Sequence, residues 1–288
     1  MTSRPRGFTL METVVVIAVL GIMGVSLGMF ILPMLTSQQA MQNRAALVDS
    51  ADIALRRMAR DIRIALPNSL KVTNVASGFT LEMIPTVDGG RYCNGDGDCN
   101  SNLTIGAADN VFDILGCFHN TTFTGSPGAG YRLVIGDSSG SVYTGAAVIT
   151  PTTTSIALSI WPGTGATPTV CGSNSATANT SNRHRVTLSA AQTFPTSSPR
   201  RRVFVVSTAV AYICDTTTQT LTRYSGYTIG AAPTTGTAAL VTDKVMACSV
   251  TSTTGQVQAT GLVTLGITLT NATETVTLMH QAQLDNSQ

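Results

Sequence analysis

Apolar residues follow two different spacings in the first quarter of the chain. Residues 13–35 carry no charge, and almost every side chain between 14 and 35 is apolar. A helix of about 22 residues rises roughly 33 Å, which matches the hydrocarbon core of a bilayer. The uniform run therefore predicts a helix that lies in a membrane or is enclosed by other protein.

Beyond Pro33 the apolar residues recur at every third or fourth position. The residues of this stripe are Leu47, Ala51, Ala54, Met58, Ile62 and Ala65. Such spacing predicts an amphipathic helix with one buried face. We expect Pro33 to kink or locally melt the helix, because proline lacks the backbone N–H, and Pro67 to end it.

Arginines occupy most of the opposite side of this second helical segment. Asp52 with Arg56, and Arg57 with Asp61, have the i,i+4 spacing of helical ion pairs. The arginine side is either a solvated face or a contact face for a partner, and both interpretations stay open.

From residue 70 onward the pattern alternates with period two, which is typical of strands. Residues 70–76 and 79–84 predict a hairpin across residues 77–78. Further strands are predicted at 111–116, 131–136, 142–149, 155–160, 186–189, 203–214, 220–224, 241–250, 262–270 and 274–284. We therefore predict an α+β fold, in which a long N-terminal helix packs on a β-rich antiparallel head.

Composition narrows the class of protein. Only 11% of residues are charged and the formal net charge is +2, whereas roughly a quarter of residues are charged in ordinary globular proteins. This balance provides no basic field for nucleic acid. The three histidines are far apart in the sequence and have no metal-ligand spacing.

The segment before the apolar run restricts its interpretation further. Arg4 and Arg6 precede the run, so the positive-inside tendency leaves this end in the cytoplasm. A secretory signal peptide has a shorter apolar region followed by an A-x-A-like cleavage site, which does not fit. A plain membrane anchor fits the length, but it gives no reason for Glu12 at the start of the run, because intramembrane carboxylates are costly.

A family resemblance is carried by the run Arg6-Gly7-Phe8-Thr9-Leu10-Met11-Glu12. This run resembles the type III signal of type IV pilins and type II secretion pseudopilins. The resemblance implies that a prepilin peptidase cuts between Gly7 and Phe8 and methylates the amine of Phe8. It also implies that Glu12 pairs with the N-terminal ammonium of a neighbouring subunit, where each charge offsets the desolvation cost of the other.

This resemblance also implies a division of the chain. Residues 1–7 form a cleaved leader, 8–35 a transmembrane and filament-core helix, 36–67 a helical stem and 68–288 the head. Looser matches are Arg60-Asp61-Ile62-Arg63, Arg202-Val203-Phe204-Val205-Val206, Val210-Ala211-Tyr212-Ile213-Cys214, Leu221-Thr222-Arg223-Tyr224 and Ala247-Cys248-Ser249-Val250. They are similar to large minor pilins of the PilW and pseudopilin J kind, above all those of the mannose-sensitive haemagglutinin (MSHA) pilus. Residues 88–185 have no such match.

The resemblance implies a non-enzymatic minor pilin that primes assembly at or near the pilus tip. Its expected partners are other minor and major pilins, the prepilin peptidase, the inner-membrane assembly platform and the membrane itself, with no nucleic acid. The precursor is expected to span the inner membrane of a Gram-negative bacterium once, with a periplasmic head, and then to reach the pilus surface. A J-like pseudopilin and a tip adhesin remain alternatives.

Six cysteines allow 15 pairings, between which sequence cannot choose. Cys93 and Cys99 bracket a short loop that can close locally. Cys214 and Cys248 lie at the ends of neighbouring predicted strands, and a similar pair is known in the resembling subfamily, which leaves Cys117 with Cys171. Free thiols are the alternative, although an exported chain favours disulfides.

Two short motifs suggest chemistry that we do not expect. Asn94, Asp96, Asp98 and Asn100 alternate like oxygen ligands of calcium, but the glycine and glutamate of an EF-hand loop are absent, which favours a solvated turn and no cofactor. Residues 136–140 fit G-x-S-x-G, which needs a following helix. A strand is predicted there instead, so we interpret a hairpin turn and expect no catalytic residue.

Overall fold

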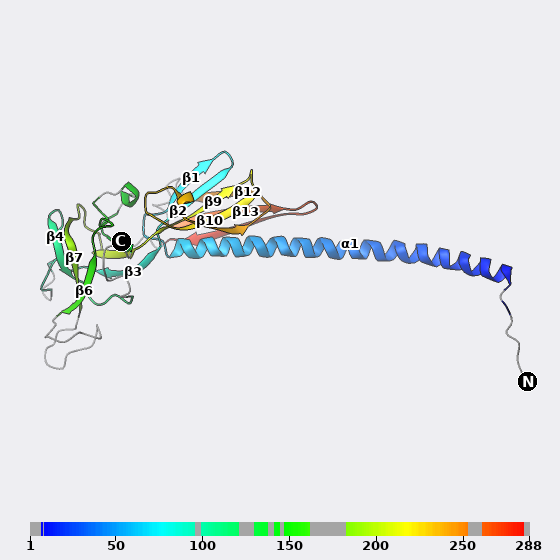
Figure 1. Cartoon of the computed structure of the whole chain (residues 1–288), viewed down its shortest axis with the longest axis horizontal. Coiled ribbons are helices and arrows are strands. Elements are labelled where there is room, and N and C mark those ends of the chain that lie inside the picture. Colours follow the sequence, from blue (N-terminus) through cyan, green and yellow to red (C-terminus); the bar gives the residue numbers. More distant parts are fainter. Residues whose placement is uncertain are drawn as a thin grey trace, which may run out of the picture.

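The computed structural model describes Gly7 and residues 9–95, 99–120, 130–137, 141–144, 147–161, 183–252 and 261–284. One long helix, α1 (Leu10–Arg63), precedes a head of antiparallel strands. Figure 1 shows α1 as a rod that leaves the head and carries the N-terminus far from it. The predicted α+β class is therefore confirmed.

The start of α1 is set by a local hydrogen bond. Thr9 is extended, with φ −80° and ψ 151°, and its Oγ1 accepts a hydrogen bond of 3.3 Å from the N–H of Glu12. This bond satisfies one of the free donors of the first turn. The helix then continues without a break through position 33, so the predicted melting at Pro33 is wrong. Losing one donor removes one of many helical bonds in a segment this long.

The sequence predicts that Pro67 ends the helix, but α1 already ends at Arg63, four residues earlier. Ile64 leaves helical geometry, with φ −94° and ψ 2°. The N–H of Leu66 donates to the carbonyl of Ile84 at 2.7 Å, and the N–H of Thr86 donates to the carbonyl of Ile64 at 2.8 Å. The chain thus exchanges helical bonds for strand-like bonds with residues 84–86 before proline is reached.

Two sheets cover one face of the second half of α1, and we call them the stem sheets. The first has the order β1 (Lys71–Val75), β2 (Gly78–Met83), β9 (Ala209–Asp215), β10 (Thr220–Tyr227) and β11 (Thr237–Thr242). The second contains β12 (Val245–Ser252), β13 (Leu262–Thr270) and β14 (Thr275–Gln283). The predicted β1–β2 hairpin is confirmed. Its Gly78 has φ +141°, and a Cβ there would lie 2.3 Å from the carbonyl oxygen of Cys214.

The amphipathic stripe of α1 forms the centre of the core between these sheets. All six predicted stripe residues are buried, with side chains between 0% and 8% exposed. They share a cluster with Phe79 and Leu81 of β2, Tyr212 of β9, and Leu265 and Ile267 of β13. Burying each large aliphatic side chain contributes about 1.5–3 kcal/mol, so this face fixes α1 to the head.

A second body, which we call the distal module, is inserted between two paired strands. β2 and β9 are neighbours, with Met83 opposite Val210, yet residues 84–208 connect them. The inserted strands are β3 (Thr86–Arg91), β4 (Ala108–Asp113), β5 (Arg132–Val134), β6 (Ile156–Trp161), β7 (Arg183–Thr193) and β8 (Arg202–Val206). They form two three-stranded sheets, β3-β8-β5 and β4-β7-β6.

The distal module has its own apolar core, and a separate cluster joins it to the stem sheets. Tyr92, Phe112, Leu133, Val186 and Phe194 are among the residues of that core, none of them more than 1% exposed. Two hydrogen bonds support the junction: the hydroxyl of Tyr143 donates to the carbonyl of Ser69 at 2.7 Å, and the Asn68 side chain donates to the carbonyl of Asp137 at 2.9 Å. Figure 1 places β4, β6 and β7 at the end of the molecule opposite the N-terminus.

The strand predictions hold best in the last third of the chain. β13 has the predicted bounds, and β14 differs by one residue at each end. The predicted strand at 203–214 is divided into β8 and β9, and that at 241–250 lies across β11 and β12. The described residues of 142–149 do not form the predicted strand, because a one-turn 3-10 helix occupies Ser141–Thr144 and Ile149 makes only an isolated bridge to Val134.

Candidate functional site

The predicted processing site lies at the free end of α1. Gly7 is exposed, Phe8 lies outside the residues that the structure describes, and Glu12 is exposed in the first helical turn. A carboxylate is favoured there by the helix dipole. Thr9 and Glu12 also have the spacing of a capping box, a signal that the sequence analysis missed and that explains why α1 begins at Leu10.

The apolar half of α1 is exposed along its described length. The helix has a window of mean hydropathy 2.7 of which 0% is buried, and its length and composition suffice to cross a membrane. Large side chains such as Ile17, Ile22 and Phe30 are 69%, 69% and 80% exposed. A Cβ placed on Gly21, Gly24 or Gly28 would meet nothing within 4 Å. This half therefore has no partner within the described part of the chain.

The charged residues of the stem divide between solvent and head. Arg56 and Asp52 form the predicted pair at 2.7 Å, with side chains 70% and 42% exposed. The predicted Arg57–Asp61 pair is wrong. Asp61 accepts hydrogen bonds from Arg223 Nε at 2.8 Å and from the Tyr212 hydroxyl at 2.7 Å, because its side chain turns toward β9 and β10. Burial, and then the charge of Asp61, raise the pKa of Tyr212 well above its ordinary value.

Two disulfides lie within the described residues, and both join pairs that the sequence suggests. Cys93 is bonded to Cys99 within the distal module, and Cys214 of β9 is bonded to Cys248 of β12. The second bond ties the two stem sheets together. Cys117 is also disulfide-bonded, whereas Cys171, its predicted partner, lies outside the described residues, so that pairing stays a prediction.

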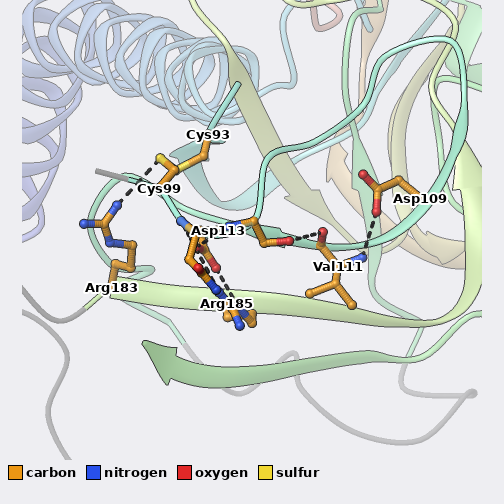
Figure 2. Close-up of polar contacts among 9 residues, drawn as sticks. Cys93, Cys99, Asp109, Val111, Asp113, Arg183 and Arg185 are labelled. Carbon is orange, nitrogen blue, oxygen red and sulfur yellow. Dashed lines mark hydrogen bonds and ion pairs between the residues drawn. A yellow bond between two sulfur atoms is a disulfide. The ribbon is translucent and has the colours of Figure 1, made fainter. Parts of the chain in front are cut away.

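Arg183 and Arg185 are the first and third residues of β7. Their side chains project toward the segment that contains residues 99–113, as Figure 2 shows. Arg185 contacts the fully buried Asp113 with two bonds, of 2.6 Å from Nε and 3.1 Å from Nη2. Burial raises the pKa of Asp113, but the bonds from Arg185 and from the backbone N–H groups of Ser101 and Asn100 outweigh burial and hold the pKa below its usual value. A buried carboxylate with this many donors anchors the loop to β7.

The other arginine, Arg183, has no carboxylate partner among the described residues. Arg183 is 8% exposed, and its Nη1 donates to Cys99 Sγ at 3.6 Å. Its buried Nε has no hydrogen-bond partner in the part of the chain that the structure describes. Sequence analysis did not single out this residue, because no local pattern links residue 183 to residue 99.

Of the calcium candidates, Asn94 and Asn100 lie within the described part of the chain. Asn94 is exposed, the N–H of Asn100 donates to Asp113, and Asp96 and Asp98 lie outside the described residues. The described ranges contain no group of three or more His, Cys, Asp or Glu that could hold a metal ion. A calcium role therefore stays a hypothesis about residues 94–100.

Within the G-x-S-x-G segment, Asp137 has a structural role. The buried carboxylate of Asp137 accepts hydrogen bonds from the N–H and hydroxyl of Ser141, at 2.9 and 3.0 Å, and so caps the 3-10 turn. Residues 138–140, where the hairpin turn is predicted, lie outside the described residues, and the strand predicted after them is wrong at Ser141–Thr144, which form this 3-10 turn. Ser138 lies outside the described residues.

His184 Nδ1 accepts a hydrogen bond from the N–H of Phe118 at 3.0 Å, and burial lowers the pKa of His184.

Comparison with known proteins gives one finding, at the N-terminus. Residues 2–28 match the model of the prokaryotic N-terminal methylation motif. No curated protein and no solved structure matches the chain. The matched range includes Gly7, Phe8 and Glu12 and ends within the apolar half of α1. The motif and the exposed apolar helix fit a membrane-anchored precursor that is cut by a prepilin peptidase, and together they support a structural, type IV pilin-like protein.

Proposed function

We propose that the chain is a minor type IV pilin, most similar to MshO of the MSHA pilus, which primes assembly at or near the tip. The observation that carries the proposal is the apolar half of α1, exposed on all sides and continuous with the methylation motif. Apolar surface of this extent has to be enclosed, first by a bilayer and then by the helices of neighbouring pilins.

The size of the head favours a minor over a major subunit. A major pilin is repeated in every layer of a helical filament, where a head with an inserted distal module is difficult to accommodate. A subunit at or near the tip has free space beside its head. The distal module lies at the end of the molecule away from the N-terminus (Figure 1), where it leaves the apolar helix free to pack.

The test is mass spectrometry on filaments sheared from cells, with the N-methyl-Phe8 peptide quantified against the major pilin. We expect a ratio near one per filament. Finding the peptide only in the membrane fraction would contradict incorporation into a surface pilus and would favour a pseudopilus of a type II secretion system.

Two variants separate processing from assembly. Gly7→Asp is expected to leave unprocessed precursor in the membrane, because the residue before the cut is altered. Glu12→Ala is expected to be cut normally but to be nearly absent from filaments, because the charge partner of the neighbouring N-terminus is lost. Normal filament content of Glu12→Ala would contradict the charge pair, and normal processing of Gly7→Asp would contradict the cleavage position.

The distal module supports a second candidate, a tip adhesin. It is a separate β-body with its own core, positioned away from the filament-forming helix. Deletion of the gene distinguishes the candidates: loss of pili supports priming, and intact pili with lost adhesion support the adhesin. Arrest of enzyme secretion with intact pili would support the pseudopilin.

A further inference from the structure

The Cys93–Cys99 disulfide differs from Cys214–Cys248 in its electrostatic surroundings. Arg183 donates from Nη1 to Cys99 Sγ, and its Nε has no partner in the described ranges. A disulfide sulfur is a weak acceptor, so among the described residues the buried guanidinium has no anion of the kind that a buried cation ordinarily requires. Arg185, two residues along the same strand, has that anion in Asp113.

Reduction of the bond would provide the missing anion. A Cys99 thiolate at the observed position would accept a charge-assisted hydrogen bond from Arg183, and a neighbouring arginine lowers the pKa of a thiol. Asp113 does not compete, because its carboxylate is occupied by Arg185 and by the N–H groups of Asn100 and Ser101. Asp98, which precedes Cys99 in the sequence, is tested separately below.

Access to the two sulfurs is unequal. Cys93 is 0% exposed, and its backbone is held on both sides, by bonds to Asp113 and to Leu103. Cys99 is partly exposed at the edge of the module. We therefore expect an external reagent to reach Cys99 before Cys93.

We propose that Cys99 is the reactive site for thiol–disulfide exchange in this protein, with Arg183 as the residue that stabilises its thiolate. The reactant is the disulfide of an extracytoplasmic thiol oxidant. This inference rests on export of the head, which the proposed function includes, and not on incorporation into a pilus.

The exchange takes place in two steps. The Cys99 thiolate attacks one sulfur of the external disulfide R–S–S–R′, which forms the mixed disulfide Cys99–S–S–R and releases R′S⁻. Cys93 then loses its proton to solvent and attacks Cys99 Sγ, which forms the Cys93–Cys99 bond and releases RS⁻. Two protein thiols are oxidised and one external disulfide is reduced to two thiols.

The first test measures the thiolate directly. In the full chain in detergent, Cys93→Ser leaves Cys99 as a single thiol of this pair, and its rate of alkylation by iodoacetamide is followed against pH. We expect an apparent pKa below the ordinary value of about 8.5, raised by Arg183→Met and retained by Arg183→Lys. The same series in an Asp98→Asn background removes the opposing charge. A pKa at or above the ordinary value that Arg183→Met leaves unchanged would overturn the proposal.

The second test uses the intact disulfides and oxidised and reduced glutathione as the probe. Trapping with N-ethylmaleimide and peptide mass spectrometry give the fraction of each pair that is reduced. We expect Arg183→Met to raise the pKa of the Cys99 thiol. The Cys93–Cys99 bond should become about tenfold harder to reduce for each unit of that rise, because the reduced form loses its stabilising cation. Cys214–Cys248 is the internal control. No shift at Cys93–Cys99, or an equal shift at both pairs, would overturn the proposal.

Discussion

The two halves of α1 share one backbone conformation and differ in how their apolar side chains are arranged. In the first half they surround the helix and stay exposed, as with Ile22. In the second half they form a stripe, represented by Met58 and Ile62, that the stem sheets bury. A striped helix needs one partner face, which its own head provides, whereas a helix that is apolar on all sides needs enclosure that a single chain does not provide.

The largest expected effect separates the halves by stability. Ile62→Ala removes a fully buried side chain and should lower the free energy of unfolding of the head by about 2–5 kcal/mol. Ile22→Ala is the matched control and should leave that free energy unchanged. Urea titration of the full chain in detergent, followed by the circular dichroism of the sheets, measures both. Equal losses would mean that the apolar half packs on the head after all.

A smaller loss is expected where the stem is held by charge. Asp61→Ala leaves Arg223 and the Tyr212 hydroxyl without their acceptor. The side chains of Asp61 and Arg223 are 13% and 19% exposed. We expect a loss of about 2–3 kcal/mol in the same titration. Asp49→Ala changes an exposed carboxylate on the same helix and serves as the control. A loss of the same size in both variants would show that helix charge in general, and not this contact, is responsible.

The glycines of the apolar half provide a test in which fold and assembly respond in opposite directions. A Cβ at Gly24 meets nothing within 4 Å, so Gly24→Ala should stabilise the helix by about 0.5–1 kcal/mol. Filament content should fall, because small residues permit close approach of helices. Helicity in detergent and the Phe8 peptide of sheared filaments are the two measurements. Unchanged filament content would mean that neighbouring helices do not approach closely here.

The smallest effect is expected on the outer face of the stem. Arg56→Ala breaks an ion pair whose two side chains are largely exposed, and such pairs contribute little to stability. We expect no measurable change in the urea titration. A loss comparable to that of Asp61→Ala would remove the distinction between the solvated and the buried side of this helix.

Periodicity predicts the elements whose environment is local. The stripe from Leu47 to Ala65 and the strand Leu262–Thr270 follow from spacing alone. Each buries one face, with a period of three to four residues in the helix and of two in the strand. The cleavage position stays a prediction, which rests on Gly7, Phe8 and Glu12 lying within one short motif that matches the N-terminal methylation model. Thr9 as the N-cap could have been predicted from its spacing to Glu12.

Long-range contacts explain what the sequence did not predict. β3 contains two glycines and has little strand propensity, yet it forms because β8 pairs with it from far along the chain. Residues 141–144 form a 3-10 turn because the buried carboxylate of Asp137 accepts their donors. Asp61 turns from Arg57 to Arg223 because β10 lies beside the stem, and the contact of Arg183 with Cys99 joins residues that share no local pattern.

The order of elements has a consequence for the timing of folding. β13 and β14, which lie directly against α1, are the last strands within the described residues, whereas the stripe that they cover is synthesised much earlier. At about 5–20 residues per second, the stripe waits roughly 10–45 s for its cover. The stem core therefore closes only after β13 and β14 have been made, so these strands leave the apolar stripe of the nascent chain uncovered throughout that interval.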